Sequence, residues 1–341
     1  MILIMGAGSV GCFLGGLLQA SGQSVVYVGR PKVLDALASH GLTLTDLDGR
    51  QNIIAARDLR LFSDLPSALG SVGDQSSVEP PVVTFLCVKA GATLAAAKIL
   101  ESSLPPGSVV VSMQNGIGQA ALAQTVAPSL CFLDGMVSFN IAHLGEGRYH
   151  RGTAGFLAAA DHPALRPVAD AFRAQKLKLR LVADMRPIQW GKLLLNLNNP
   201  VNALSGRPLR DELMQAGYRR CLAALQEEAL QVLRAAAIEP AQLTAVTPQA
   251  FLRVLRLPTF LFRLVARQAL KIDAKARSSM ADDLSAGRPT EITWLCGEVE
   301  RLAQSVGLQA PLNARMQALV EASPQRGAPY SPRQLAEALG V

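Results

Sequence analysis

The first motif that could bind a ligand is Gly6-Ala7-Gly8-Ser9-Val10-Gly11. It follows the apolar run Ile2–Met5, predicted to be a strand, and precedes a stretch with helical periodicity. In that context Gly6 permits a tight turn, Gly8 lets the backbone approach a pyrophosphate, and Gly11 allows close helix–strand packing. The N–H groups at the start of the helix would bind the phosphates. The motif therefore predicts a dinucleotide site; the alternative is a glycine-rich turn that binds nothing.

The end of the second predicted strand, Val25–Val28, distinguishes between two cofactors. An NAD enzyme usually carries Asp or Glu there to bind the ribose 2′-hydroxyl. Here the chain reads Val28-Gly29-Arg30, and a guanidinium suits the 2′-phosphate of NADP, with Lys32 able to assist. We therefore expect NADPH as the cofactor. The alternative is a solvated arginine at a strand end.

A lysine in an otherwise apolar helical stretch is a candidate for acid–base chemistry. Lys192 lies between Trp190 and Leu193, where burial near a site would lower its pKa. Asn196 follows four residues later, so it shares a helical face with Lys192 and could bind the same ligand. A lysine that extends from a core helix to solvent explains the same pattern equally well. The residues alone leave both readings open.

Motifs along nearly the whole chain resemble those of the ketopantoate reductases (2-dehydropantoate 2-reductases) and related 2-oxoacid reductases. They are Gly6–Gly11, Arg30, Val88-Lys89-Ala90, Gln114-Asn115-Gly116, Trp190–Asn196, Ala276–Met280 and Gly287–Ile292. No single motif is diagnostic, but their order and spacing together are specific. The resemblance implies reduction of 2-dehydropantoate to (R)-pantoate by NADPH, within the pathway to pantothenate and coenzyme A. A related branched 2-oxoacid is the nearest alternative substrate.

The resemblance also implies roles for the residues around Lys192. Lys192 would be the general acid that protonates the ketone oxygen, where negative charge develops in the transition state. Asn196 would contact the hydroxyl or carbonyl of the substrate, with Asn199 close behind it. For Asn199 the alternative is a helix-capping role before Pro200.

Two further residues complete the implied catalytic set. Ser279 would bind the carboxylate of the 2-oxoacid, and Glu291 would contact cofactor or substrate and help to hold the active lysine. A helix cap and an acid in a first helical turn are the respective alternatives. Asp282 and Asp283 are nearby acids that we expect on a solvated face without a function.

Three residues that follow predicted strands complete the implied cofactor site. Lys89 comes after Val82–Val88, at the carboxyl end of the sheet, where cofactors bind. Asn115, in a turn after Val109–Ser112, resembles the family asparagine near nicotinamide and substrate, and Asn140 matches a position whose backbone lies beside the nicotinamide. A common strand terminator and a common Asn-Gly turn are the alternatives for Lys89 and Asn115.

Departures from the family pattern concern the substrate. Cys296-Gly297 stands where the family often shows Asn-Gly, and Ser205–Leu213 lacks a further substrate asparagine. NADPH-dependent ketone reduction is therefore better supported than ketopantoate itself. Rival functions are a dehydrogenase of the 6-phosphogluconate or glycerol-3-phosphate type, and a non-catalytic NADP-binding sensor or scaffold. The Ser279–Glu291 segment counts against the former, and Lys192 with Glu291 against the latter.

The elements that must position these residues predict an α/β protein of two domains. Residues 1–183 form an NADP-binding Rossmann-type doubly wound domain, because strands and helices alternate there. The expected strands are Ile2–Met5, Val25–Val28, Val82–Val88, Val109–Ser112, Leu133–Phe139, Thr153–Ala158 and Leu179–Val182. The expected helices are Val10–Ala20, Lys32–Ser39, Ala92–Leu100 and Pro163–Ala174. The polar Ser71–Pro81 segment should be an exposed loop.

Residues 184–341 predict an all-helical catalytic domain, whose first helix would carry Lys192 into the cleft between the domains. Its helical stretches are Met185–Asn196, Asp211–Ala236, Pro248–Leu255, Leu261–Lys271, Glu291–Val306 and Leu312–Ala322. In the basic Phe251–Lys271 segment, Pro258 favours a two-helix corner over a helix on a membrane surface. Ser323–Pro332 should be a linker before a short terminal helix.

Composition narrows the function classes. The chain has 341 residues, 50% of them hydrophobic, so it can bury sizeable cores. The net charge of +7 comes from basic residues spread along the chain without interleaved aromatics, which favours an anionic small ligand over nucleic acid. The longest apolar run, Val82–Val88, is far below the ~20 residues of a membrane span. The scattered cysteines and histidines predict neither disulfides nor a metal site. We expect a cytoplasmic protein, and a homodimer stays open.

Overall fold

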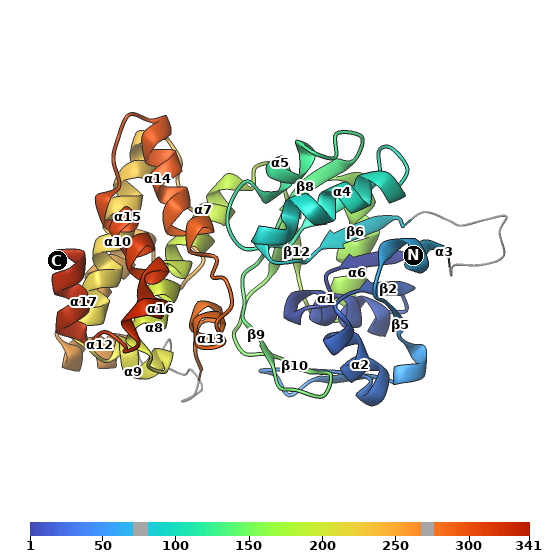
Figure 1. Ribbon diagram of the computed structural model, residues 1–341, viewed down its shortest axis with the longest axis horizontal. Coiled ribbons are helices and arrows are strands. Elements are labelled where there is room, and N and C mark those ends of the chain that lie inside the picture. The colour runs from blue at the N-terminus through green and yellow to red at the C-terminus, as the bar shows by residue number, and fades with distance from the viewer. Residues whose placement is uncertain (71–80, 267–275) are drawn as a thin grey trace. The chain divides into compact units, whose positions relative to one another are not determined.

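The computed structural model describes residues 1–70, 81–266 and 276–341. These residues divide into two compact units, Met1–Met185 and Arg186–Val341 (Figure 1). The first unit contains both β-sheets, and the described part of the second contains only helices and turns. The fold is therefore an α/β unit followed by a helical unit, as the alternation of patterns predicts.

The larger sheet of the first unit is doubly wound. Its strand order is β12-β11-β8-β7-β6-β1-β2-β5. The strands are β1 (Ile2–Met5), β2 (Val25–Val28), β5 (Arg60–Phe62), β6 (Val83–Leu86), β7 (Val109–Ser112), β8 (Cys131–Val137), β11 (Leu157–Ala160) and β12 (Leu179–Val182). Neighbouring strands are parallel except β8 and β11. Because β2 and β6 lie on opposite sides of β1, the strand order reverses at β1.

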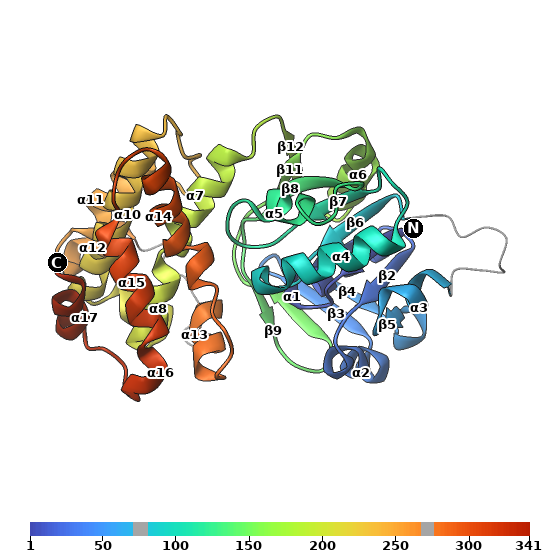
Figure 2. The same ribbon diagram turned by 45° about the horizontal axis from the view of Figure 1, so that its top comes forward.

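Helices cover both faces of this sheet because successive side chains of each buried strand point to opposite sides. Ile2 and Ile4 belong to the apolar core that includes α1 and α6, whereas Leu3 and Met5 belong to the core that includes α3, α4 and α5 (Figure 2). The helices are α1 (Ser9–Ala20), α2 (Pro31–His40), α3 (Leu65–Gly70), α4 (Thr93–Ser103), α5 (Gln119–Gln124) and α6 (Arg166–Ala174).

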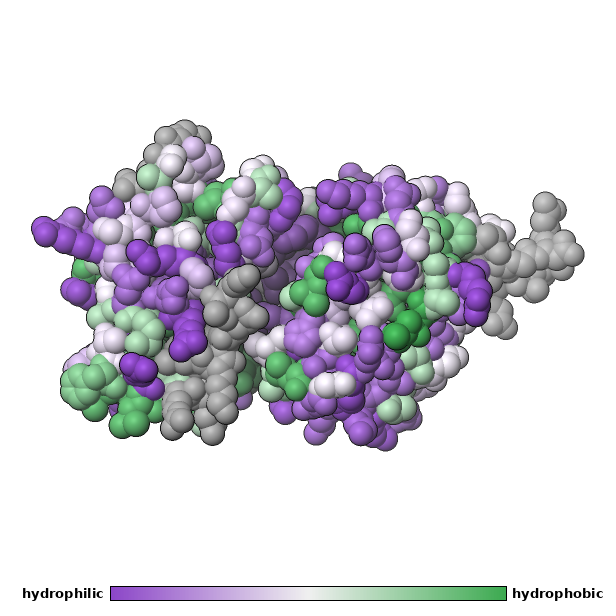
Figure 3. Space-filling model, turned by 90° about the horizontal axis from the view of Figure 1, so that it is seen from below, coloured by the Kyte–Doolittle hydropathy of each residue, from purple (hydrophilic) through white to green (hydrophobic). Residues whose placement is uncertain are grey.

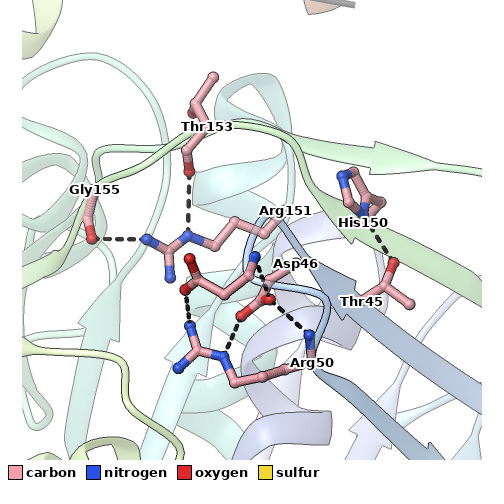
Figure 4. Close-up of polar contacts among 8 residues, drawn as sticks. Thr45, Asp46, Arg50, His150, Arg151, Thr153 and Gly155 are labelled. Carbon is pink, nitrogen blue, oxygen red and sulfur yellow. Dashed lines mark hydrogen bonds and ion pairs between the residues drawn. The ribbon is translucent and has the colours of Figure 1, made fainter.

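A second, four-stranded sheet was not predicted. Its order is β4-β3-β10-β9, built from β3 (Leu42–Asp46), β4 (Gln51–Ile54), β9 (Ile141–His143) and β10 (Arg148–Arg151). β3 and β10 pair in parallel, and Thr45 Oγ1 lies 2.8 Å from His150 Nδ1. The Arg50 side chain donates to Asp46 Oδ2 at 2.6 Å and closes the β3–β4 turn (Figure 4). The apolar alternation in these strands is too short to have identified them.

The second unit packs around α10, a largely buried helix that lies against α8, α9, α11, α14, α15 and α17. The helices are α7 (Arg186–Asn196), α8 (Asn198–Ser205), α9 (Leu209–Leu213), α10 (Ala216–Ala235), α11 (Pro248–Leu255), α12 (Thr259–Val265), α13 (Ser279–Ser285), α14 (Cys296–Ser305), α15 (Pro311–Glu321), α16 (Ser323–Arg326) and α17 (Pro332–Leu339). Arg219 of α10 is fully buried and donates to the carbonyls of Leu255 and Leu257, which fixes the corner between α11 and α12. The expected break at Pro258 is confirmed.

Several expected elements need correction. The strand expected at Thr153–Ala158 begins only at Leu157, because the Thr153 and Gly155 carbonyls accept hydrogen bonds from the Arg151 side chain (Figure 4). The expected long helix Asp211–Ala236 is interrupted between α9 and α10.

Other expectations differ only in extent. The one-turn helix α16 lies within the expected linker Ser323–Pro332. The helix expected at Leu261–Lys271 is described as α12 up to Val265, and its residues 267–271 lie outside the described part of the chain. Of the loop expected at Ser71–Pro81, only Pro81 is described.

The surface and the described helices can be compared with the expectations about a membrane span and a metal site. No helix in the described ranges is long and apolar enough to cross a membrane. Hydrophilic residues predominate on the face drawn in Figure 3, and apolar side chains gather in small patches. Within the same ranges, no group of three or more potential ligands from His, Cys, Asp and Glu is arranged to hold a metal ion.

Candidate active site

The glycine motif forms the turn between β1 and α1. Gly6 has φ +112°, and a Cβ there would lie 2.7 Å from the Val88 nitrogen, so only glycine fits. A Cβ on Gly11 would lie 2.1 Å from the Gly6 carbonyl oxygen, which shows how closely α1 approaches the turn. The N–H groups of Gly6 and Ala7 both donate to the Val28 carbonyl, at 2.9 and 3.0 Å. The turn is therefore held rigidly against the end of β2.

Gly8 differs from its two neighbouring glycines. No described atom lies within 4 Å of the place where its Cβ would be, so the space above this residue is open. Gly8 is also the N-cap of α1, with no side-chain cap and no acidic residue in the first turn of the helix. A pyrophosphate fits this arrangement, because free N–H groups and the positive end of the helix dipole face open space.

Arg30 lies where the sequence expects a residue that selects the cofactor. It is exposed and follows β2, as the N-cap of α2. A Cβ on Gly29 would lie 2.6 Å from Ala7 Cβ, so the end of β2 packs directly on the glycine turn. In the part of the chain that the structure describes, no acid forms an ion pair with the Arg30 guanidinium. Its charge is available to an anionic ligand.

Lys89 and Asn115 follow β6 and β7, and Gln114 joins their loops. Gln114 is buried, and its Nε2 donates to the Val88 carbonyl at 3.0 Å and to Thr93 Oγ1 at 2.7 Å. Its Oε1 accepts from the Ser112 hydroxyl at 2.9 Å. Lys89 and Asn115, each adjacent to one end of this bridge, are exposed. The buried amide therefore fixes the spacing of two exposed polar residues.

Asn140 follows β8 by a short turn. Its side chain is exposed, its backbone N–H donates to Thr153 Oγ1 at 2.9 Å, and its carbonyl accepts from the Gly152 N–H at 3.0 Å. Both bonds tie the turn to the segment after β10. The position of the Asn140 backbone is thus fixed independently of its side chain.

The candidate cofactor residues converge on one edge of the sheet. β1, β2, β6, β7 and β8 are mutually parallel, so their carboxyl ends meet at this edge. The residues that follow those ends are the Gly6–Gly11 turn, Arg30, Lys89, Asn115 and Asn140. Ligands of doubly wound sheets bind at this edge, next to the strand where the order reverses. The structure therefore brings the whole predicted cofactor set together.

In the second unit, Lys192 and Asn196 share one face of α7. Lys192 is partly buried, and burial lowers the pKa of its ammonium group to about 8. No residue among those described forms a hydrogen bond or an ion pair with that group. Asn196 is 9% exposed. A partly desolvated ammonium beside an amide suits proton donation to a ligand oxygen.

The α7 helix holds Lys192 firmly. Gly191 packs so closely on the segment after α10 that a Cβ would lie 2.4 Å from the Ala241 carbonyl oxygen. From α10, Gln226 Nε2 donates to the Leu194 carbonyl at 2.8 Å. The neighbouring Trp190 is buried. The lysine backbone is therefore fixed from two sides.

Asn199 and Ser279 lie on two helices, α8 and α13, that pack together. The Ser278 hydroxyl donates to the Asn199 carbonyl at 3.3 Å and accepts from the Ala281 N–H at 3.2 Å, so Ser278 is the N-cap of α13. Ser279 itself is exposed. The capping role considered for Asn199 is wrong, because α8 begins at Asn198 and its N-cap is Leu197, without a side-chain bond.

The acids in α13 and just after it differ in burial. Asp283 is 4% exposed and accepts from Arg288 Nε at 2.9 Å, so the expectation of a solvated face is wrong for this residue. Asp282 is exposed, as expected. Glu291 is partly buried and precedes the short turn η4 (Ile292–Trp294). Its backbone carbonyl accepts a hydrogen bond from the Trp294 N–H at 3.0 Å.

Comparison with known proteins decides the family. The family model described as ketopantoate reductase PanE/ApbA matches residues 2–163, and its C-terminal counterpart matches residues 184–323. The chain belongs to the ketopantoate reductase family. A 2-dehydropantoate 2-reductase from Archaeoglobus fulgidus is 26% identical over 328 residues, which cover 94% of this chain and 96% of the relative. A relative of the same name from Halobacterium salinarum is 25% identical over 96% of this chain and 99% of its own.

Solved structures of other proteins share the fold. A PanE/ApbA family ketopantoate reductase from Ralstonia eutropha superposes with a TM-score of 0.77 at 24% identity, covering 95% of this chain and 98% of that one. A D-mandelate dehydrogenase in complex with NADH and anilino(oxo)acetate superposes with a TM-score of 0.74 at 18% identity, covering 95% and 98%.

Sequence reasoning missed three residues that position others. Gln114 was noted only as part of a motif, and its bridge to Val88 depends on a neighbouring strand. Asn202 and Glu212 were not singled out, although both are fully buried. An Asn one helical turn after Asn199 was the available signal for Asn202. Nothing local distinguishes Glu212 from an ordinary acid in a first helical turn.

Proposed function

We propose that the protein reduces 2-dehydropantoate to (R)-pantoate with NADPH, as a step toward pantothenate and coenzyme A. The observation that carries this proposal is similarity to 2-dehydropantoate 2-reductases over nearly the full length of both chains. A partly buried lysine of lowered pKa in the helical unit supports it from the side of chemistry.

The cofactor would bind along the sheet edge described above. The open space above Gly8 and the start of α1 suit the pyrophosphate. The exposed Arg30 suits the 2′-phosphate of NADPH, since a guanidinium pairs with phosphate through two parallel N–H bonds. When bound, the nicotinamide supplies the hydride that adds to the ketone carbon. Lys89, Asn115 and the Asn140 backbone would hold the cofactor from the neighbouring strand ends.

Lys192 would donate the proton that completes the reduction. As the ketone carbon gains a hydride, negative charge develops on its oxygen, and an ammonium group near that oxygen stabilises and then protonates it. A pKa of about 8 keeps the lysine mostly protonated at neutral pH while making the proton easier to release. Asn196, on the same helical face, would donate a hydrogen bond from its amide to the same ligand.

Ser279 would bind the substrate carboxylate through its exposed hydroxyl. The packing of α8 on α13 brings Asn199 to the same end of these helices, where it would bind a second polar group of the substrate. Glu291 would contact cofactor or substrate and support the protonated form of Lys192.

A different 2-oxoacid is the second candidate substrate. Cys296 and the Ser205–Leu213 segment depart from the ketopantoate pattern, and D-mandelate dehydrogenase, which shares the fold, forms a complex with anilino(oxo)acetate. The deciding experiment follows NADPH absorbance with 2-dehydropantoate beside a panel of branched and aromatic 2-oxoacids. Preference for 2-dehydropantoate supports the proposal, and preference for another acid changes only the substrate. No turnover with any of them, at saturating NADPH, would favour a non-catalytic NADP-binding protein.

A further inference from the structure

A carboxyl group without a positive partner lies inside the helical unit. Glu212 of α9 is 0% exposed, and its Oε2 accepts from Asn202 Nδ2 at 2.9 Å and from Asn198 Nδ2 at 3.3 Å. Within the described ranges, no Lys, Arg or His forms an ion pair with it. Burial of an unpaired carboxylate is costly, so some other feature must stabilise this side chain.

Glu212 and Asn198 each have one buried acceptor atom without a donor among the residues that the structure describes. The two atoms are Glu212 Oε1 and Asn198 Oδ1. An ionised carboxylate and an amide oxygen only accept, so they cannot satisfy one another. A protonated Glu212 supplies the missing donor. With the proton on Oε1, its O–H can bind Asn198 Oδ1 while Asn198 Nδ2 binds Oε2, as in an acid–amide pair.

Charges around Glu212 agree with a neutral acid. Desolvation by burial raises the pKa of Glu212 to about 8, although the two asparagine bonds oppose the shift. On α10, burial raises the pKa of Tyr218 and of Cys221, and the nearby Glu212 carboxyl adds to both shifts. The guanidinium of Arg219 on the same helix binds the Leu213, Leu255 and Leu257 carbonyls.

The remaining nearby charges also leave Glu212 unpaired. Arg207, between α8 and α9, interacts with Tyr218 through its side chain. On α9 itself Arg210 and Asp211 are the other charged residues, and Asp211 is exposed. The described part of α8 has no titratable side chain.

Asn202 transmits the position of Glu212 to α13. It is 0% exposed, and its Nδ2 also donates to the Arg207 carbonyl at 2.9 Å. Its Oδ1 accepts the Ser278 backbone N–H at 2.9 Å. Ser278 in turn caps α13 and binds the Asn199 carbonyl. A continuous set of hydrogen bonds therefore runs from Glu212 to the residue that precedes Ser279.

We propose that Glu212, as a neutral acid, is a positioning residue for substrate binding: it orients Asn198 and Asn202, and through Asn202 it fixes the Ser278–Ser279 end of α13. The proposal rests on the proposed function, because Ser279 is the group assigned there to the substrate carboxylate. Glu212 acts only through its neighbours and touches neither substrate nor cofactor.

The test compares Glu212→Gln, Glu212→Ala and Asp211→Asn in the full-length protein. The glutamine is a matched replacement for a neutral acid, because its amide donates to Asn198 Oδ1 and its oxygen accepts from Asn202. We expect Glu212→Gln to keep KM for the 2-oxoacid within about twofold, and Glu212→Ala to raise it about tenfold, as expected when buried amides lose a partner. The value of kcat and the Kd for NADPH should hardly change. Asp211→Asn, an exposed charge removal one residue away, should change neither.

Two outcomes would overturn the proposal. If Glu212→Gln raises KM as much as Glu212→Ala, the charged form is required. If Glu212→Ala folds and leaves KM unchanged, Glu212 does not position the substrate. Should the alanine variant fail to fold, Asn202→Ser, which retains a short polar side chain but cannot bridge Glu212 to Ser278, takes its place with the same expected rise in KM.

A measurement that does not use activity tests the protonation separately. A carboxylic-acid C=O infrared band should be present in the wild type at neutral pH and be lost in Glu212→Gln. The unfolding free energy should also fall as pH rises between the ordinary pKa of 4.5 and about 8, because only the folded form holds the proton there. That slope should be smaller in Glu212→Gln. Absence of both effects rejects the neutral acid, whereas absence of all 2-oxoacid turnover in the wild type rejects the proposed function instead.

Discussion

Gln114 Nε2 donates a hydrogen bond to the Val88 carbonyl at 3.0 Å, which ties the loop after β7 to the loop after β6. Because Asn115 follows Gln114 and Lys89 follows Val88, one buried amide sets the spacing of two candidate cofactor residues. The neighbouring Thr93 hydroxyl accepts from the same amide at 2.7 Å. Gln114 therefore positions the two exposed residues, although its own buried side chain is not part of the candidate site.

Removal of this bridge should weaken cofactor binding. We expect Gln114→Ala to cost about 1–3 kcal/mol in unfolding free energy, because the Val88 carbonyl loses a buried donor, and to raise the Kd for NADPH. Fluorescence titration and denaturant unfolding measure the two effects. Gln124→Ala is the control: this glutamine binds the Leu130 carbonyl at 2.8 Å, before β8, so it should affect stability only. If Gln114→Ala and Gln124→Ala changed the Kd for NADPH equally, the proposed role of the Gln114 bridge would be contradicted.

Two glycines of the same motif should respond differently to alanine. Gly8→Ala should fold normally, because its Cβ meets no described atom, but should weaken NADPH binding about tenfold by filling the space left for the pyrophosphate. Gly11→Ala should destabilise the fold by about 1–3 kcal/mol or more, since its Cβ would collide with the Gly6 carbonyl. Thermal unfolding and NADPH titration separate the cases. Unchanged NADPH affinity in Gly8→Ala would remove the pyrophosphate from this turn.

Arg30 should determine the preference for NADPH over NADH. We expect NADPH to bind at least about tenfold more tightly, through a charge-assisted pair with the 2′-phosphate, and Arg30→Ala to remove most of that difference. Isothermal titration with both cofactors measures it. Arg57→Ala, which removes an exposed arginine of the η1 turn (Ala56–Asp58), should leave the ratio unchanged. Equal affinities in the wild type would refute the assignment.

Lys192 should control the chemical step and its dependence on pH. Lys192→Ala should lower kcat by ~10²–10⁴, the usual effect of losing a general acid, with NADPH binding largely retained. In the wild type, the rate of reduction should fall as pH rises through about 8, because the neutral amine has no proton to donate. The reverse oxidation should rise over the same range. A rate that stays constant from about pH 6 to pH 10 would exclude Lys192 as the proton donor. This range extends about two units to either side of the lysine pKa.

Ser279 should affect the substrate and not the cofactor. Ser279→Ala should raise KM for the 2-oxoacid several-fold, because one hydrogen bond to a carboxylate is lost, while the Kd for NADPH stays constant. Ser285→Ala, at the opposite end of α13, is the control, since its hydroxyl binds the Ala281 carbonyl at 2.7 Å. An effect confined to NADPH affinity would show that Ser279 has been assigned to the wrong ligand.

The central strands and the family motifs were predictable because their signals are local. β1, β2, β7 and β12 occur at the expected residues, since buried strands read as short apolar runs. The second sheet was not predictable, because β3 pairs with β10 from a distant part of the chain. The break after Met214 was missed because the apolar positions continue across it.

Some residues of the candidate site could likewise be predicted from local sequence, and others could not. The Gly6–Gly11 turn and the Lys192–Asn196 spacing are visible in the residues themselves. The burial of Glu212 is not, because Asp211-Glu212 resembles any acidic pair in a first helical turn, where the helix dipole favours such residues. Only the packing of α8 and α13 shows which of the two acids is enclosed.

The parallel pairing of β3 with β10 has a consequence for synthesis of the chain. Thr45 and His150, which are hydrogen bonded across this pair, are 105 residues apart. The local β3–β4 hairpin can form as soon as residue 54 has left the ribosome, but its β3 edge then has no neighbour until β10 is made. During that interval the edge is open to strands of other nascent chains. We expect translational pausing before Arg148 to promote aggregation more than pausing after Arg151.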